Sequence, residues 1–282
     1  MLTIGLLHST IRGDEKLIIQ AAQKRNVQVE VIDIRNEILN PDTAKYHFNT
    51  ALQRSVSTIK GTYVTHYFES MGIQVVNSSK VTKICEDKFY TSLQLHKHKV
   101  PTLRFAMVFT YQEALNVIED MGGFPVVIKP ALGSWGRLLT KVNDKDSLES
   151  IIEHKDVLGS PHQKAYYIQE YVNKPGRDIR SFVIDGKTIC AIYRNSSHWI
   201  TNTARGGHAE NCPLSKEIIT LSKNASNAIG GGILAMDIIE TPDGMKINEI
   251  NHTMEFKNSE APTGVSISEA IIDYCIQKDK NL

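Results

Sequence analysis

The first 80 residues alternate between two hydrophobic periods. Short segments that are apolar or alternate at every second position predict strands, and longer segments with apolar residues every three or four positions predict helices. We expect strands at 2–7, 27–34 and 73–77, and helices at 14–26 and 61–72. This β–α–β order is typical of a small parallel sheet. No GxGxxG motif follows the first strand, so a dinucleotide site is not indicated.

The pattern changes after residue 81, where strands follow one another more closely. Helices are expected at 85–98, 111–122, 146–158, 215–229 and 266–278. Strands are expected at 102–109, 124–130, 138–142, 165–172, 233–240 and 245–251, with a hairpin over 178–194 that turns at Asp185-Gly186. The chain therefore predicts an α/β (α+β) protein with an N-terminal βαβ domain over 1–81 and two α+β lobes over 82–164 and 165–282.

Composition narrows the class of protein. The 32 basic and 31 acidic residues leave a net charge of +1, which does not favour a nucleic-acid partner. The four cysteines are scattered without metal-ligand spacing and indicate free thiols in a reducing compartment. The N-terminus lacks the basic lead of a signal peptide, and no window approaches the roughly 20 apolar residues of a membrane span. We expect a soluble cytoplasmic protein with no membrane partner.

Polar residues interrupt the strand expected at 245–251. Strict alternation places Ile247, Glu249 and Asn251 on one face of this strand. Asn248 and Ile250 then face the other side. A carboxylate and an amide two residues apart on one face of a strand need an explanation.

Asp237 offers one explanation. It lies in the apolar strand 233–240, which a turn at 242–244 joins to 245–251, so antiparallel pairing places Asp237 near residues 248–250. Two carboxylates and an amide are oxygen donors, the ligand set of Mg²⁺ rather than Zn²⁺. The alternative is a partly exposed sheet face with ordinary polar residues. A carboxylate within an apolar strand is costly unless it is paired, and a metal that also holds phosphates supplies a partner.

A glycine-containing loop, GSWG at 133–136, lies between two expected strands. Glycines let backbone N–H groups wrap an anion such as phosphate. Lys129, four residues upstream, and Lys88, on a helix, are candidates to neutralise that phosphate. The alternatives are a plain hairpin connection and two solvated surface lysines.

Arginines and an extended segment complete the candidate chemistry. Planar guanidinium groups match carboxylate and phosphate, so Arg177, Arg180, Arg194 and Arg205 suit an acidic substrate, although each taken singly is an ordinary surface charge. The segment 169–172 (QEYV) can present backbone groups to a purine edge, with Glu170 accepting from the exocyclic amine; the alternative is an edge strand.

These segments occur in one order that resembles the RimK-like branch of the ATP-grasp enzymes. The match rests on Lys88, VVIKPALGSWGR, IQEYV, GRDIR, YRNSSHWITNTARGG, Asp237 and NEINHTMEFKNS, and it runs from about 81 to 270. Within that branch the chain is similar to the LysX-type ligases, which join α-aminoadipate to the carrier protein LysW. The N-terminal 80 residues match more loosely. The resemblance implies two lobes that clamp ATP.

The resemblance also implies roles for the nucleotide site. Lys88 and Lys129 resemble the lysines that grip the ATP phosphates. The mobile loop over the phosphates corresponds to Gly133, Ser134, Trp135, Gly136, Arg137, Leu138 and Leu139. The adenine hinge and its continuation correspond to Gln169, Glu170, Tyr171, Val172, Asp178 and Asn202. The Mg²⁺ ligands, for two ions, correspond to Asp237, Glu249 and Asn251.

A second group of residues corresponds to the reacting substrates. Arg194 resembles the arginine that stabilises an acylphosphate and its tetrahedral successor, and Lys129 assists it as a catalytic residue. The amino-acid pocket corresponds to Arg180, Arg194, Thr203, Arg205, Glu255, Phe256, Lys257, Asn258, Ser259 and Thr263.

The implied reaction is an ATP-dependent, ADP-forming carboxylate–amine ligation in lysine biosynthesis. Transfer of the γ-phosphoryl group to a carboxylate gives an acylphosphate, which an amine attacks to form an amide. A closing loop must exclude water, which otherwise hydrolyses the intermediate. The resemblance implies two partners, a small acidic LysW-like carrier with a C-terminal glutamate and a free dicarboxylic amino acid, and a homo-oligomer.

The identity of the amino acid depends on two residues. Related ArgX-type ligases, which load glutamate, show Gly-Phe where this chain has Asn258-Ser259. Asn-Ser leaves room for one more methylene and favours α-aminoadipate, although one methylene is worth only about 1–3 kcal/mol. The alternatives within the family are a glutamate–LysW ligase, an enzyme of dual specificity that serves lysine and arginine biosynthesis, and a ligase that adds glutamate to a protein tail. An alternative of another class is an ATP-binding module without catalysis, which Asp237, Glu249, Asn251 and Arg194 argue against.

Overall fold

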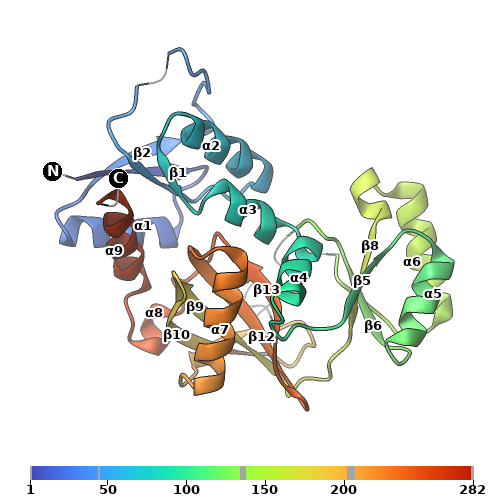
Figure 1. The fold of residues 1–282 in the computed structure, drawn as a ribbon. Coiled ribbons are helices and arrows are strands. Elements are labelled where there is room, and N and C mark those ends of the chain that lie inside the picture. The colour runs from blue at the N-terminus through green and yellow to red at the C-terminus, as the bar shows by residue number, and fades with distance from the viewer. Residues whose placement is uncertain (1, 44, 134–137, 202–206, 281–282) are drawn as a thin grey trace.

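The computed structural model describes residues 2–43, 45–133, 138–201 and 207–280. Within these ranges the chain builds three sheets, one in each of three successive parts of the sequence (Figure 1). The five-stranded sheet of the C-terminal part lies between the N-terminal sheet and the central one. This arrangement confirms the expected α/β class.

The N-terminal part is a parallel sheet, as its β–α–β order predicts. Its elements are β1 (Thr3–His8), α1 (Gly13–Lys24), β2 (Gln28–Asp33), β3 (Thr50–Gln53), α2 (Thr58–Ser70) and β4 (Gln74–Val76). The strand order is β2-β1-β3-β4, with every pair parallel. The hydrophobic pattern missed β3, because its sequence TALQ is short and buried on both faces and therefore shows no alternation.

The central part packs two helices on an antiparallel sheet. Its elements are α3 (Ser79–Glu86), α4 (Lys88–Lys97), β5 (Phe105–Val108), α5 (Tyr111–Asp120), β6 (Val126–Lys129), β7 (Thr140–Val142), α6 (Lys145–Leu158), the 3₁₀ helix η1 (Pro161–Lys164) and β8 (Tyr166–Glu170). The strand order is β5-β8-β6-β7. The single helix expected at 85–98 was wrong. Asp87 is extended and caps a new helix, because its carboxylate accepts the Phe89 and Tyr90 amides.

The C-terminal part contains the sheet that carries most of the candidate site. Its elements are β9 (Arg177–Ile184), β10 (Lys187–Asn195), β11 (His208–Asn211), α7 (Lys216–Ile229), β12 (Ile233–Thr241), β13 (Gly244–Asn251), α8 (Glu260–Thr263) and α9 (Ile267–Asp279). The order is β11-β10-β9-β12-β13, all antiparallel, and the hairpin at Asp185-Gly186 is confirmed. The polar sequence of β11 and the brevity of α8 hid both elements from the pattern.

An irregularity in β13 corrects the expected faces of that strand. Asp237 pairs with Glu249, but the next residue of β12 pairs with Ile247, so Asn248 is an extra residue in a β-bulge. Ile247 and Ile250 are consequently both buried, at 0% and 1% exposure, in one core under α7. The expectation that Ile247 shares a face with Glu249 was therefore wrong. The bulge removes it from the polar face and turns Asn248 toward Lys129.

The other face of this sheet packs against the N-terminal part. A continuous core joins Ile4 and Ile18 of the N-terminal part to Phe182 of β9 and to Ile267 and Ile271 of α9. Helix α9 returns beside α1, so both chain ends lie near each other in Figure 1. Because this core is shared, the start of α1 is held next to the segment that follows β13.

Two further features concern the whole chain. Over the residues that the structure describes, no helix has the length and apolar character that crossing a membrane requires. All four cysteines are buried free thiols, as their scattered positions predicted.

Candidate active site

The centre of the site is formed where the inner face of the five-stranded sheet changes from apolar to polar. Phe182 and Ala235 on this face belong to the shared core, whereas Arg180 and Asp237, two residues further along the same strands, do not. Asp237 is 4% exposed. Alternation carries both kinds of residue to one face, so a single sheet anchors the site to the core of the molecule.

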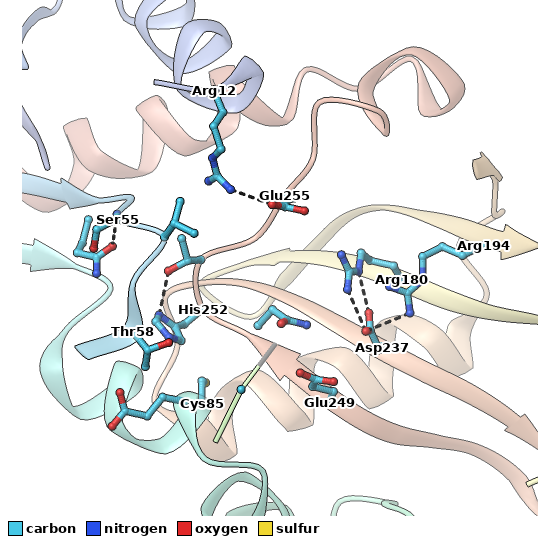
Figure 2. Close-up of a pocket in the computed structure, with 16 residues that line it drawn as sticks. Arg12, Ser55, Thr58, Cys85, Arg180, Arg194, Asp237, Glu249, His252 and Glu255 are labelled. Carbon is cyan, nitrogen blue, oxygen red and sulfur yellow. Dashed lines mark hydrogen bonds and ion pairs between the residues drawn. The ribbon is translucent and has the colours of Figure 1, made fainter. Parts of the chain in front are cut away.

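Asp237 is paired with two arginines (Figure 2). Arg180 donates from Nε and Nη2 to its two oxygens at 2.7 and 2.9 Å, and Arg194 Nη2 lies 3.0 Å from Oδ2. Burial by itself raises the pKa of Asp237, but the two guanidinium groups outweigh it and hold that pKa well below its usual range. Asp237 is therefore a carboxylate at neutral pH.

Glu249 and Asn251 stand beside Asp237 on the adjoining strand. The expected pairing of β12 with β13 is confirmed, and Glu249 lies directly across from Asp237. Its side chain is 25% exposed and lies 3.6 Å from Lys88 Nζ. Among the hydrogen bonds of the described residues, the buried Asn251 amide nitrogen has no partner. Three oxygen-bearing side chains thus line one cavity.

The donor set of these residues fits Mg²⁺. All three side chains offer oxygen, which Mg²⁺ prefers. A carboxylate has about four acceptor positions, and the arginines use three of those on Asp237, so one is left for a metal. Among the residues that the structure describes, no three His, Cys, Asp or Glu side chains form a closed metal centre. An open site of two carboxylates and an amide is consistent with a metal that also binds phosphate oxygens.

A second buried carboxylate, Asp178, orients Arg194. Arg194 is 2% exposed and donates from Nε and Nη2 to Asp178 at 2.6 and 2.7 Å. Thr201 also donates to Asp178 at 2.5 Å, and Lys174 Nζ lies 3.6 Å from it. Arg194 is consequently held between Asp178 and Asp237 in a bidentate geometry.

The two lysines point toward this centre. Lys88, at the first turn of α4, is 7% exposed and donates to the Gly133 carbonyl. Lys129, at the end of β6, is 3% exposed and donates to Asn248 Oδ1 at 3.3 Å. Burial lowers the pKa of Lys129 to about 8, although Glu249 opposes that shift. Both lysines are buried in the site, which excludes the alternative of two solvated surface lysines.

A cavity beside Lys129 has the lining expected of a nucleotide site. Leu103, Val127 and Ile239 provide apolar walls, and Leu139 and the segment 169–172 also line the cavity. Tyr171 meets Trp199 edge to face at 6.3 Å between ring centres. Glu170 is already engaged, because it accepts from Arg104 at 2.8 Å and from Lys246 at 3.2 Å. Both partners lower its pKa, which burial alone would raise.

A separate cavity contains the residues expected to bind the amino acid. It is lined by Arg12, Asp14, Arg180, Ile192, Arg194, Ala209 and the segment 255–259. Thr263 lies behind this wall on α8, and its hydroxyl donates to the Ser259 carbonyl at 2.6 Å. Leu138 is exposed, with a positive φ of 58°. The other expected residues, Ser134, Trp135, Gly136, Arg137, Asn202, Thr203 and Arg205, lie outside the described residues.

Several residues of the site were not identified from the sequence. The N-terminal part contributes Arg12 and Arg54, the bulge contributes Asn248, and the polar loop contributes Thr201. Trp199 also lines the nucleotide cavity. None of these residues belongs to a sequence motif with a recognisable spacing. The only related feature in the sequence is the acidic start of the first helix, where Asp14 and Glu15 look like ordinary N-terminal charges.

Comparison with known proteins agrees with this geometry. Residues 85–275 match the RimK-like ATP-grasp domain, and residues 4–84 match the LysX preATP-grasp domain. The chain belongs to the RimK-like ATP-grasp family, and it is an ATP-dependent ligase.

The similar relatives include two groups of LysW ligases. The α-aminoadipate–LysW ligase LysX of Saccharolobus solfataricus is 34% identical over 93% of this chain and 96% of its own length. The glutamate–LysW ligase ArgX of Sulfurisphaera tokodaii is 31% identical over 96% of this chain and 97% of its own length. This chain is therefore similar to ligases of both specificities.

Solved structures show the same fold. An ATP-grasp RimK domain protein of Sphaerobacter thermophilus superposes with a TM-score of 0.81 at 22% identity, over 96% of this chain and 98% of the other. The ligase PsnB, in complex with a minimal precursor, Mg and ADP, gives 0.73 at 18% identity, over 98% and 97%. ATP-grasp ligases use ATP and Mg²⁺.

Proposed function

We propose that this ligase joins the α-amino group of α-aminoadipate to the side-chain carboxyl of the C-terminal glutamate of a LysW-like carrier, through an acylphosphate, in lysine biosynthesis. The observation that carries this proposal is the convergence of Asp237, Glu249 and Asn251 with Arg194 and two buried lysines around one cavity. An amino-acid-sized cavity adjoins it through Arg180 and Arg194.

The first group of residues is assigned to Mg-ATP. Lys88 and Lys129 are placed to hold phosphates, with Asp237, Glu249 and Asn251 as ligands of Mg²⁺, for which we propose two ions. Bound Mg-ATP supplies the γ-phosphoryl group. Segment 169–172 is assigned to the adenine edge, with Asp178 continuing the nucleotide site.

Arg194 is the residue best placed to stabilise charge on the reacting carbonyl. A bidentate contact with Asp178 and a single contact with Asp237 fix its guanidinium before substrate arrives, so little reorganisation is needed when charge develops. Arg180 is fixed by Asp237, and it lines both the cavity of Asp237, Glu249 and Asn251 and the amino-acid cavity. We assign Arg180 and segment 255–259 to the amino acid, which must present its α-amine to the carbonyl held near Arg194.

The choice of α-aminoadipate rests on Asn258 and Ser259. Both residues line the cavity, and Ser259 is 3% exposed, so a bulkier residue there takes volume from the cavity rather than extending into solvent. Two small polar residues leave room for the longer amino acid and offer hydrogen bonds to its distal carboxylate. Glutamate is the second candidate, because the ArgX relative matches nearly the whole chain.

Amino-acid-dependent ADP release tests the proposal. The purified enzyme is given Mg-ATP and either α-aminoadipate or glutamate, with and without an acidic carrier that ends in glutamate. We expect turnover only with the carrier and a higher kcat/KM for α-aminoadipate. A matched carrier with its terminal glutamate removed is the control. Turnover without any carrier refutes the carrier as acceptor, and a higher kcat/KM for glutamate assigns the second candidate.

A further inference from the structure

The start of α1 makes buried hydrogen bonds to the wall of the amino-acid cavity. Asp14 is 3% exposed, and its Oδ1 accepts the backbone N–H of Phe256 at 2.8 Å and of Lys257 at 2.7 Å. These two amides come directly before Asn258 and Ser259 in the chain. A carboxylate from the N-terminal part therefore holds the backbone of a cavity wall that belongs to the C-terminal part.

A second contact holds the same segment two residues earlier. Arg54 follows β3, is 3% exposed, and donates from Nη1 to the Met254 carbonyl at 2.8 Å. Its guanidinium also lies 5.9 Å from the centre of the Phe256 ring. Glu15, at 0% exposure, accepts from Arg54 Nε at 3.0 Å and balances its charge. The backbone from 254 to 257 is thus bonded at three points by one buried network.

A third contact, the ion pair of Arg12 with Glu255, lies where the amino-acid cavity meets the cavity lined by Asp237, Glu249 and Asn251. Arg12 donates to Glu15 at 3.0 Å and to Glu255 at 2.8 Å. Figure 2 shows Arg12 and Glu255 above Asp237 and Glu249. Arg12 and Glu255 line both cavities. The Glu255 side chain is 45% exposed, so this contact is weaker than the buried ones.

Buried polar groups keep such contacts because a buried donor or acceptor without a hydrogen-bond partner costs free energy. If Asp14 is removed, the buried N–H of Phe256 and the partly buried N–H of Lys257 lose their acceptor, and the segment must shift to find another. A shift of about 1 Å in a positioning segment is enough to change a rate substantially. The network therefore affects the shape of the cavity more directly than it affects the phosphate site, which β6, β12 and β13 build.

We propose that Asp14 is a positioning residue for amino-acid selection. From the N-terminal part, and supported by Glu15 and Arg54, it holds segment 255–259 in the conformation that accepts a dicarboxylic amino acid. Selectivity is then shared between the side chains of segment 255–259 and Asp14, which comes more than 240 residues earlier in the chain, lines the same cavity and fixes the backbone of that segment. This inference rests on the function proposed above.

The test compares two aspartates that make similar bonds in different places. Asp144 Oδ1 also accepts two hydrogen bonds, from the Ser147 amide and hydroxyl, each at 2.7 Å, but it caps α6 in the central part. We expect Asp14→Ala to raise the KM for the amino acid about tenfold or more and to lower the preference for α-aminoadipate over glutamate. The KM for ATP should stay within about twofold. Asp144→Ala should leave all these constants unchanged.

Conservative replacement distinguishes positioning from a general loss of structure. Both bonds to Asp14 end on one oxygen, so Asp14→Asn keeps an acceptor in place, and we expect it to restore most of the amino-acid affinity. If Asp14→Ala does not fold, Asp14→Ser, whose hydroxyl is shorter, is measured in its place with the same expectation.

Two results overturn this inference. One is an amino-acid KM and preference in the Asp14 variants equal to those of Asp144→Ala. The other is an equal loss of ATP and amino-acid affinity. Failure of the proposed function looks different, because wild-type enzyme then shows no carrier-dependent turnover at all.

Discussion

Replacing Asp237 with asparagine separates its structural role from the metal-binding role proposed for it. Asp237→Asn keeps the volume of the side chain and one oxygen acceptor but removes the charge between Arg180 and Arg194. Arg194 keeps its bidentate contact with Asp178. Within the described part of the chain, Arg180 makes no ion pair other than the one with Asp237.

The size of the effect follows from burial. Breaking a buried ion pair by removing one partner costs about 3–5 kcal/mol, because the remaining charge is left uncompensated. Asp237 is 4% exposed, but Arg194 retains a second carboxylate, so we expect the low end, about 3 kcal/mol. For a chain of this size that corresponds to a fall in Tm of about 6 °C.

The sign of the pH dependence follows from the lowered pKa of Asp237. A carboxylate whose pKa is lower in the folded state stabilises the fold above its unfolded pKa of about 4, and this contribution is lost as pH falls toward the folded value. Wild type should therefore lose its advantage over Asp237→Asn as the pH is lowered from about 5 to about 2.

Glu249→Gln is the matched control. It removes the neighbouring carboxylate, which is partly exposed and has only Lys88 Nζ, at 3.6 Å, as an ion-pair partner among the described residues. An ion pair of this kind is worth about 0–1 kcal/mol, so stability should hardly change. Mg²⁺-dependent nucleotide binding should weaken in both variants, because each loses a charged oxygen ligand.

The assays are urea unfolding followed by circular dichroism, and calorimetric titration of nucleotide with and without Mg²⁺. Equal destabilisation by the two variants would falsify the reasoning, because only Asp237 is buried between arginines. A loss below about 1 kcal/mol for Asp237→Asn refutes the estimated energy of the buried pair. Unchanged Mg²⁺ dependence in Glu249→Gln removes the metal assignment.

Three further outcomes are expected. Lys129→Met should raise the free energy of unfolding by about 1–3 kcal/mol, because burial of the ammonium group lowers the pKa of Lys129 to about 8. The same change should weaken ATP binding. Melting curves measure the first effect, and calorimetric titration measures the second. N258G/S259F should shift kcat/KM from α-aminoadipate toward glutamate, and unchanged ratios contradict the cavity argument. Burial raises the pKa of Cys190 to about 11 and of Cys275 to about 12, so iodoacetamide at pH 8 should label native protein far more slowly than urea-unfolded protein. Equal rates refute that burial.

Local patterns predicted most of the secondary structure because each long element carries its own signal. The parallel N-terminal sheet, the hairpin at 178–194 and the pairing of Asp237 with residues 248–250 all follow from short-range periodicity and turn chemistry. The elements that were missed, β3, β11 and α8, are short and lack a hydrophobic period. Asp87 divides the helix expected at 85–98 because a side-chain cap competes with helix continuation.

The oxygen-bearing side chains of the candidate site were identified from the sequence because an apolar strand makes a carboxylate conspicuous. The bulge at Asn248 was not predicted from the sequence, because strict alternation is the default expectation for a strand and a single extra residue does not change the composition noticeably. The ion pairs of Arg180 and Arg194 with Asp237 join strands that are far apart in the chain, so this partner could be assigned only from coordinates.

The sequence by itself determined the class of fold and the oxygen-donor side chains, since these depend on residue type and spacing along single elements. The role proposed for the two lysines came from the resemblance to the family, because spacing alone favours surface lysines. Only the tertiary structure decided which residues share a cavity. Arg12, Asp14 and Arg54 reach segment 254–257 because a common core packs α1 and α9 against the five-stranded sheet. Hydrophobic burial is non-directional, so it holds these parts together without leaving a motif in the sequence. The specific contacts between the N-terminal part and the five-stranded sheet then form because buried charges and amides need hydrogen-bond partners.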